Sequence, residues 1–256
     1  MLLAIDAGNT NTVFAVYDGD TRRGQWRLST DSERTADEYA VWLMALMKLE
    51  GLERGDIDAA ILATVVPQAT FDLKRLCRHY FGATPLEVGN TVILDLKIAL
   101  PKPEEVGADR LVNAVAAHKI YGGPAIVIDF GTSTNFDIID GEGTYLGGIL
   151  APGINLSLEA LHMAAAKLPR IAVARPETVI GTGTVPAMQS GIYYGYLGLI
   201  EGLVERTITE FGAPMTVIAT GGLAPLFAEG TDAIQHVDPD LTMRGLLEIW
   251  QRNAKS

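Results

Sequence analysis

Two segments about half a chain apart share one pattern, and this internal repeat constrains the fold more than any other feature of the sequence. The first segment is Ala4-Ile5-Asp6-Ala7-Gly8-Asn9-Thr10-Asn11-Thr12, followed by an apolar run and Asp18-Gly19. The second is Val127-Ile128-Asp129-Phe130-Gly131-Thr132-Ser133-Thr134-Asn135, followed by an apolar run and Asp140-Gly141. Each predicts a buried strand ending in Asp-x-Gly, a polar loop, a second strand and a hairpin turn. Duplication is the simplest explanation.

Helical and strand patterns alternate between and after the two hairpins, which favours a mixed α/β architecture. A capping box at Thr35-Ala36-Asp37-Glu38 begins a helix that Gly51 ends. We expect further strands at 57–66 and 215–219, and helices at 67–81, 108–121, 156–167, 185–211 and 241–253. Because Gly122-Gly123-Pro124 interrupts the chain just before the second hairpin, we place the domain boundary there and predict domains 1–122 and 123–256.

Charge limits the partners that the chain can bind. Acidic residues number 31 against 20 basic residues, a formal net charge of −11, so the surface should repel nucleic acid. An anionic ligand must therefore be held locally, by backbone amides, a bound cation or a few basic side chains. The single cysteine, Cys77, excludes a disulfide framework and is best interpreted as a buried structural thiol.

The first residues read directly as a strand, without the basic and apolar pattern of a secretion signal. Gly, Asp or Glu interrupts every apolar run before it reaches the roughly 20 residues of a membrane span. We therefore expect a cytoplasmic protein with no membrane segment.

A strand that delivers Asp-x-Gly into a loop of Asn and Thr suits a magnesium-bound triphosphate. Glycine permits close backbone approach, amides and hydroxyls donate to phosphate oxygens, and the carboxylate can hold hydrated Mg²⁺. One copy alone is more often an ordinary hairpin turn. Two copies, with Thr220-Gly221-Gly222 as a third glycine turn on the adenosine side, have the order expected of an ATPase cleft. Since neither a Walker loop nor G-x-G-x-x-G is present, we predict two duplicated ribonuclease-H-like (actin-like) domains with the ATP cleft between them.

Five motifs make the chain resemble the type III pantothenate kinases over about residues 1 to 225, in the family's order and at similar spacing. They are Asp6-Ala7-Gly8-Asn9-Thr10, Glu105-Val106-Gly107-Ala108-Asp109-Arg110-Leu111-Val112-Asn113-Ala114, Asp129-Phe130-Gly131-Thr132, Gly147-Gly148-Ile149-Leu150-Ala151-Pro152-Gly153 and Ala187-Met188-Gln189-Ser190-Gly191. The resemblance implies a cytoplasmic homodimer that transfers the γ-phosphate of ATP to pantothenate in the first step of coenzyme A synthesis. It also implies a requirement for a monovalent cation, potassium or ammonium.

The same resemblance assigns residues to roles. It implies that ATP phosphates and Mg²⁺ are bound by Asp6 and the adjoining loop, Ala7, Gly8, Asn9, Thr10, Asn11, Thr12 and Val13. Gly131 and Thr132 would contact ATP, and Asp129 would hold the monovalent cation. Asp109 would be the general base. Pantothenate would contact Leu100, Gly107, Ala108, Arg110 and Thr184.

Taken without the resemblance, several of these residues have structural interpretations. Asp109 begins a predicted helix and could simply cap it. Arg110 could pair with the pantothenate carboxylate or with a surface carboxylate. Thr184 is typical of a helix N-cap before Val185-Pro186. As a base, an Asp of ordinary pKa suffices, because in phosphoryl transfer it mainly orients the attacking hydroxyl.

The chain departs from the family near the acceptor. Many members have Tyr where this chain has Leu100, followed by Pro101-Lys102-Pro103, and many have Lys-Asn where it has Thr182-Gly183. These changes concern how the acceptor is held. Because the fold hosts many functions, two others stay open: a kinase of the same fold for a sugar, acetate or another small alcohol or acid, and a non-catalytic ATP-binding regulator or filament-forming protein.

Four glycines, Gly191, Gly195, Gly198 and Gly202, fall on one face of the predicted 185–211 helix. Because each weakens a helix by about 1 kcal/mol relative to Ala, the set indicates close approach of another backbone. That backbone could belong to the same chain or to a second subunit.

Overall fold

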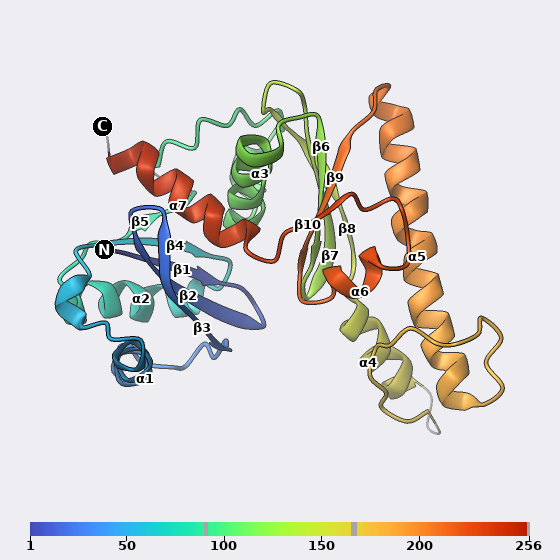
Figure 1. The fold of residues 1–256 in the computed structure, drawn as a ribbon, viewed down its shortest axis with the longest axis horizontal. Helices are drawn as coiled ribbons and strands as arrows, with labels where there is room; N and C mark the ends of the chain where they lie inside the picture. Colours follow the sequence, from blue (N-terminus) through green and yellow to red (C-terminus); the bar gives the residue numbers. More distant parts are fainter. Residues whose placement is uncertain (90–91, 165–167, 255–256) are drawn as a thin grey trace. The chain divides into compact units, whose positions relative to one another are not determined.

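A computed structural model describes residues 1–89, 92–164 and 168–254. The chain forms two compact units (Figure 1). Unit 1 comprises Met1–Leu96, Pro101–Ala116 and Asp240–Ser256, and unit 2 comprises Lys97–Leu100 and Ala117–Pro239. This division by contacts differs from the predicted one at residues 122 and 123, because the C-terminal helix packs in unit 1 and the 108–121 helix is shared.

Unit 1 is built on a five-stranded sheet of order β3-β2-β1-β4-β5. The strands are β1 (Leu2–Ala7), β2 (Asn11–Asp18), β3 (Thr21–Ser29), β4 (Ala59–Thr64) and β5 (Leu86–Glu87). The first three are antiparallel neighbours, while β4 runs parallel to β1 and β5 runs parallel to β4. Because β1 lies in the middle with helices on both faces, its residues are apolar in unbroken succession up to Asp6.

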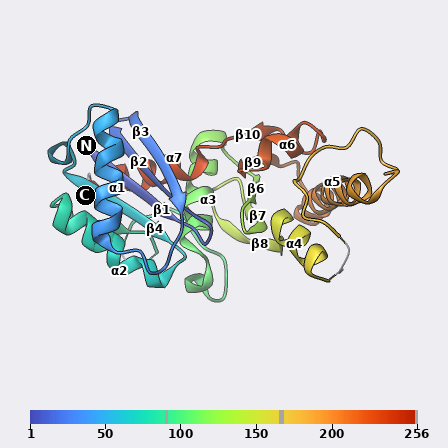
Figure 2. The ribbon, with the colours of Figure 1, turned by 90° about the horizontal axis from the view of Figure 1, so that it is seen from below.

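Helices cover both faces of this sheet (Figure 2). Leu3 and Ile5 of β1 face α1 (Ala36–Leu49) and α2 (Pro67–Arg75), and a π-helical turn at Leu76–Tyr80 extends α2. Leu2 and Ala4 face α3 (Ala108–Tyr121) and α7 (Leu241–Ala254). Short 3₁₀ turns lie at Arg54–Asp56 and Pro103–Glu105. Alternate side chains of one strand thus enter two different cores.

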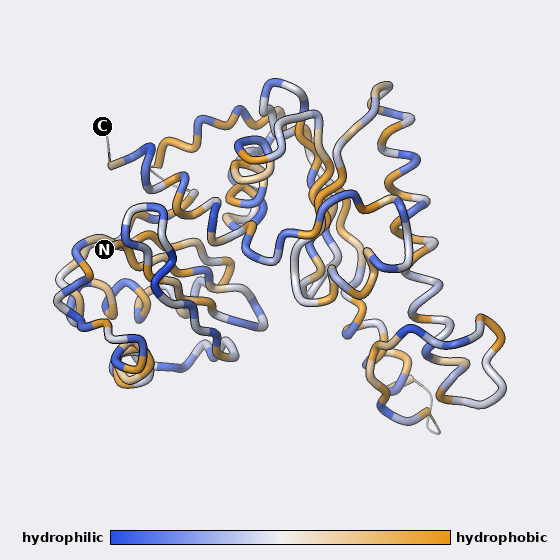
Figure 3. The backbone as a smooth tube through the Cα atoms, in the orientation of Figure 1, coloured by the Kyte–Doolittle hydropathy of each residue, from blue (hydrophilic) through white to orange (hydrophobic). Residues whose placement is uncertain are grey.

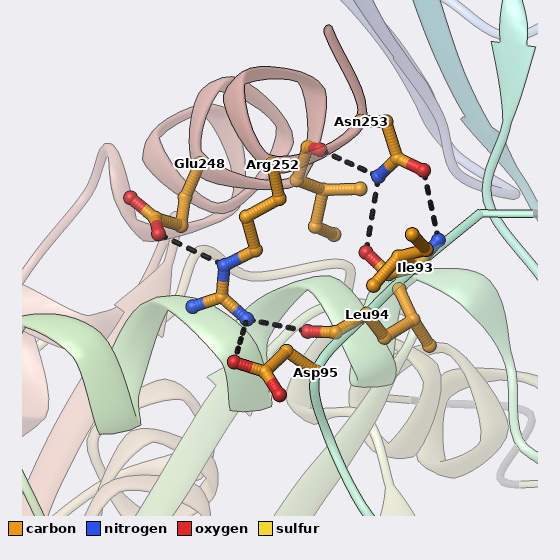
Figure 4. A network of polar contacts seen from close by, with 7 residues as sticks. Ile93, Leu94, Asp95, Glu248, Arg252 and Asn253 are labelled. Carbon is orange, nitrogen blue, oxygen red and sulfur yellow. Dashed lines mark hydrogen bonds and ion pairs between the residues drawn. The ribbon is translucent and has the colours of Figure 1, made fainter. Parts of the chain in front are cut away.

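The end of α7 is fastened to the segment after β5 (Figure 4). The Asn253 side chain accepts from the Ile93 amide at 2.9 Å and donates to the Ile93 carbonyl at 3.0 Å. Arg252 donates to the Leu94 carbonyl at 2.5 Å. These backbone contacts, together with the apolar face of α7, explain why the last helix belongs to unit 1.

Unit 2 repeats the plan with the order β10-β9-β6-β7-β8. Its strands are β6 (Ala125–Phe130), β7 (Ser133–Ile139), β8 (Tyr145–Pro152), β9 (Thr216–Gly221) and β10 (His236–Val237). Its helices are α4 (Ile154–Ala164), α5 (Thr184–Phe211) and α6 (Ala224–Ala228). Figure 3 shows the apolar residues concentrated in the central strands, where Ile128 and Phe136 pack against Tyr193 and Phe227. In unit 1, β4 and β5 continue the sheet parallel to β1, and in unit 2, β9 and β10 continue it parallel to β6. This common order confirms the duplicated α/β fold.

The predicted helices are largely confirmed. Thr35 and Glu38 form the capping box, with the Thr35 amide 2.8 Å from Glu38 Oε2. The predicted helix 156–167 begins at Ile154 and is helical to Ala164, while residues 165–167 lie outside the described residues. The hairpin turns predicted at Asp18-Gly19 and Asp140-Gly141 lead into β3 and β8, but no bounds were predicted for either strand. In β3 the reason is that this edge strand is mostly charged and polar and has no apolar run.

Two further expectations concern composition. Cys77 is buried, and burial raises the pKa of its thiol to about 12, so the predicted structural thiol is confirmed. Among the described helices, none is long and apolar enough to cross a membrane.

Candidate functional site

The first Asp-x-Gly loop joins β1 to β2. Asp6 pairs with Val13 across the hairpin, and the Gly8 amide donates to the Asn11 carbonyl at 3.0 Å. Asn9 and Thr10 at the tip are exposed. The loop therefore exposes short polar side chains beside the half-buried carboxylate of Asp6.

The second loop joins β6 to β7 with the same kind of closure. Here the Gly131 amide donates to the Ser133 carbonyl at 3.0 Å, and Asp129 pairs with Asn135. The loop is one residue shorter than the first, because Asp129 meets the sixth residue after it whereas Asp6 meets the seventh. Gly131 is exposed and Thr132 follows it at the tip, also exposed.

Neither Asp-x-Gly glycine is required by the backbone. Gly8 and Gly131 both lack a left-handed φ. A Cβ at Gly8 would lie 3.4 Å from the Asn11 carbonyl oxygen, and one at Gly131 would lie 3.6 Å from the Ser133 carbonyl oxygen. The fold itself therefore has room for a methyl group at both positions, and neither glycine is explained by packing or backbone conformation.

The third glycine signal has a different cause. Gly221 ends β9 with φ +90°, and a Cβ there would lie 2.6 Å from the Phe130 carbonyl oxygen on the neighbouring strand. Packing and backbone conformation alone therefore require glycine at this position. The next residue, Gly222, has no atom within 4 Å of its Cβ position.

Asp109 lies in the first turn of α3. Its Oδ1 accepts from the Arg110 amide at 2.8 Å, but that amide also donates to the Gly107 carbonyl at 3.1 Å. The Arg110 amide at the start of the helix therefore has a hydrogen-bond acceptor, the Gly107 carbonyl, even without the Asp109 carboxylate. Burial raises the pKa of Asp109. The hydrogen bond from the Arg110 amide and the positive charge of Arg110 oppose this rise. A partly buried carboxylate that the helix does not need is a candidate for chemistry.

Gly107 connects Asp109 to the first loop. A Cβ on Gly107 would lie 2.6 Å from Asp109 Oδ1 and 3.4 Å from Val65 Cγ1, so glycine makes room for the carboxylate. The Val65 amide in turn donates to the Ala7 carbonyl at 3.1 Å. Since β1 and β4 are parallel, their carboxyl ends meet at one edge of the sheet, the usual position of ligand sites in open α/β sheets. The structure thus brings Asp109 to the edge where the first loop lies.

The remaining predicted acceptor residues divide between the units. Ala108 is buried in unit 1 with its side chain in the core, so only its backbone can face a ligand. Arg110 is partly exposed in the same turn. Leu100 belongs to unit 2, where its Cδ2 lies 3.5 Å from the Cβ position of Gly147.

Thr184 is exposed at the first position of α5, also in unit 2. The interpretation of Thr184 as an N-cap was wrong by one residue. Gly183 occupies the cap with φ −162° and ψ 171°, and no side chain caps the helix. The Thr184 hydroxyl is therefore not needed as the cap of α5.

Two residues outside the predicted set contact the loops. Thr30 comes directly after β3 and bonds to the first loop, and Gly153 comes directly after β8 and packs on the second. Thr30 and Gly153 are 123 positions apart, the same separation as Asp6 and Asp129. Extending the sequence repeat beyond the hairpins would therefore have paired these two residues.

A family model described as "Type III pantothenate kinase" matches residues 2–206. The chain belongs to the type III pantothenate kinase family. It is 69% identical over 255 residues to the type III pantothenate kinase of Paramagnetospirillum magneticum, covering 99% of this chain and 98% of that one. It is 68% identical over 254 residues to that of Rhodospirillum rubrum, covering 99% of both chains. The predicted family and the prediction of an ATP-dependent kinase are confirmed.

Solved structures resemble this type III pantothenate kinase in fold. One is the activator of the 2-hydroxyisocaproyl-CoA dehydratase from Clostridium difficile, solved with bound ADPNP. It has a TM-score of 0.55 at 12% sequence identity, and the match covers 99% of this chain and 96% of that one. At this identity the likeness concerns the fold alone, and it agrees with the predicted actin-like architecture.

Proposed function

We propose that this type III pantothenate kinase transfers the γ-phosphate of ATP to the primary hydroxyl of pantothenate, giving 4′-phosphopantothenate in the first step of coenzyme A synthesis. Membership of the family carries the proposal. The position of Asp109 supports it, because a carboxylate without a required capping role lies at the sheet edge beside the first loop.

ATP phosphates are proposed to bind the first loop, from Asp6 to Val13, with Gly131 and Thr132 of the second loop as further contacts. Within the first loop Ala7 and Thr12 are buried, so direct contacts with the phosphates are proposed for its other residues. The open space at Gly8 and Gly131 supports this assignment. Mg²⁺ fits Asp6, since this ion usually keeps several waters and takes one or two carboxylates with the substrate phosphates. Among the described residues, no group of three or more acidic, His or Cys side chains could hold a metal ion. When bound, Mg²⁺ would neutralise charge on the phosphates.

Asp109 is proposed to accept a hydrogen bond from the pantothenate hydroxyl, orient it toward the γ-phosphate and take its proton late in the transfer. The ionised carboxylate is the active form. Its raised pKa, caused chiefly by burial, makes the ionised carboxylate a stronger base than that of an exposed Asp.

For the acceptor, Arg110 is proposed to pair with the pantothenate carboxylate, a bidentate geometry that a guanidinium favours. Gly107 and the Ala108 backbone would border the same end of α3, and Leu100 and Thr184 would contact the acceptor from unit 2. Asp129 is proposed to hold the monovalent cation, potassium or ammonium.

A homodimer is proposed through the glycine face of α5. At Gly191, Gly195, Gly198 and Gly202 a Cβ would meet no atom within 4 Å, so the chain's described residues do not pack closely there. No described segment of unit 2 packs closely on these glycines, which supports the second alternative, a subunit interface. We also propose a cytoplasmic location and no nucleic-acid partner, in keeping with the net charge of −11.

The decisive experiment measures ATP consumption by the purified protein with and without pantothenate. We expect kcat/KM for pantothenate at least about 10³-fold above that for glucose, glycerol or acetate, because unpaired polar groups penalise the wrong acceptor. A sugar or acetate used as well as pantothenate would refute the proposed acceptor. ATP binding without phosphorylation of any acceptor would favour the regulator instead.

A further inference from the structure

Thr30, the residue directly after β3, forms hydrogen bonds with the first loop through both its side chain and its backbone. Its hydroxyl donates to the Gly8 carbonyl at 2.6 Å, and its amide donates to the Thr10 carbonyl at 2.9 Å. The loop spans only Gly8 to Thr10 between its two strands. One residue therefore contacts the carbonyl groups at both ends of the loop.

A second hydroxyl supports Thr30. The Oγ1 atoms of Thr12 and Thr30 are 2.9 Å apart. Since a hydroxyl has one proton and that of Thr30 goes to Gly8, Thr12 must donate to Thr30. Thr12 is completely buried, so the chain of bonds from Thr12 through Thr30 to Gly8 starts in the core. Hydrogen bonds in such chains strengthen one another.

The bond to Gly8 determines where the next amide points. In a planar trans peptide the carbonyl and the amide N–H of the next residue point in opposite directions. Because the Gly8 carbonyl points toward Thr30, the Asn9 N–H points away from Thr30. An amide that points away from the residue supporting the loop can donate to a phosphate oxygen.

The second unit uses the equivalent position differently. Gly153 stands directly after β8 as Thr30 stands directly after β3. A Cβ on Gly153 would overlap the Thr132 carbonyl oxygen and lie 2.9 Å from that of Gly131. In both units, then, the residue after the third strand lies against the hairpin loop, once by hydrogen bonds and once by close backbone packing.

We propose that Thr30 is a positioning residue for ATP binding. Its hydroxyl holds the Gly8 peptide in the orientation that directs the Asn9 amide to a phosphate. This inference rests on the proposed role of the first loop in binding ATP.

The test compares the affinity of five proteins for a non-hydrolysable ATP analogue with Mg²⁺, by calorimetry: the unmodified protein, Thr30→Val, Thr30→Ser, Thr30→Ala and Thr70→Val. Valine keeps the β-branched shape and the backbone amide but removes the hydroxyl. We expect Thr30→Val to raise the Kd about 5- to 30-fold, in the range for one or two lost hydrogen bonds, and Thr30→Ser to restore affinity to within about 3-fold.

Thr70→Val is the matched control, since the Thr70 hydroxyl also bonds to a backbone carbonyl of unit 1, that of Val66 at 3.3 Å. It should leave the Kd unchanged. Steady-state kinetics on Thr30→Val should show a raised KM for ATP with the KM for pantothenate within about 2-fold, a split that a general loss of folding does not produce.

The outcomes separate two failures. If the unmodified protein does not bind the analogue, the proposed function fails. If the unmodified protein binds it and Thr30→Val binds equally well, or Thr30→Ser is as weak as Thr30→Val, only the role of Thr30 is overturned. Thr30→Ala is measured as well, and unfolding of both hydroxyl-free variants would assign the hydroxyl to folding and overturn the proposal.

Discussion

The two Asp-x-Gly loops have the same place in their sheets but are held in different ways. The first is supported by the Thr30 hydroxyl and amide, and the second packs directly on the backbone of Gly153. A hydrogen-bonded support tolerates small changes of side chain, whereas a backbone contact without room for a methyl group does not. A duplicated frame can therefore preserve the position of a loop while its support diverges.

The units also differ in the helices that accompany their sheets. Helix α3, which begins in unit 1, carries Asp109 in its first turn, whereas α4 and α5 of unit 2 have no acidic residue there. The proposed base therefore lies at the start of a helix of the first unit, and neither of these two helices of the second unit has an acidic counterpart there. Substitutions in both units test this asymmetry.

The largest effect is expected for Asp109→Asn. The change should lower kcat by about 10² to 10⁴, the range for a positioned base. In the unmodified enzyme, kcat should fall as the pH decreases through the raised pKa of Asp109, and the variant should lack this dependence. The measurement is kcat against pH for both proteins.

Stability distinguishes the base from a cap. Because the pKa of Asp109 is raised on folding, the folded state binds its proton more tightly, so its contribution to stability decreases as pH rises from the unfolded to the folded pKa. At neutral pH, Asp109→Asn should therefore have an equal or higher Tm. A lower Tm with near-normal turnover would reduce Asp109 to a structural cap.

The two loop carboxylates should respond differently. Asp6→Ala should lower magnesium-dependent activity, by about 10² if the ion loses its protein ligand. Asp129→Ala should chiefly raise the potassium or ammonium concentration needed for half-maximal activity. Titrations of Mg²⁺ and of each monovalent cation separate the two. Indifference of the unmodified protein to monovalent cations would remove the role proposed for Asp129.

Arg110→Ala tests whether acceptor binding belongs to the α3 end of the first unit. It should raise the KM for pantothenate by about 10-fold or more, since a charge-assisted bond contributes about 1.5 to 3 kcal/mol, and change the KM for ATP far less. An unchanged KM for pantothenate would end the assignment of Arg110 to the carboxylate.

The smallest effect on turnover is expected from a methyl group behind the second loop. Gly153→Ala should displace the Thr132 carbonyl, destabilise the protein by about 1 to 3 kcal/mol and raise the KM for ATP a few-fold. Gly131→Ala is the control, because its Cβ would make only ordinary contacts and should leave the Tm nearly unchanged. Equal Tm values for the two variants would contradict the difference in support.

Much of the fold could be predicted from local patterns. The hairpins, the Thr35 capping box and the 108–121 helix depend on short-range periodicity and caps, and all were predicted. The bounds of edge strand β3 were not predicted, because its mostly charged and polar residues have no apolar run. They form a strand by pairing with β2. The grouping of α7 with unit 1 depends on contacts between residues far apart in the chain, such as Asn253 with Ile93.

By itself, the sequence determined the duplication, the family and the residue types for phosphate and acceptor chemistry, because these depend on order and spacing along the chain. Tertiary structure decided which glycines the fold requires. Gly221 is required by a neighbouring strand and its backbone conformation, whereas Gly8 and Gly131 have room for a methyl group. It also decided that Thr30 touches the loop 22 residues before it. A contact of this kind arises from strand pairing across the sheet, and pairing depends on all the strands at once.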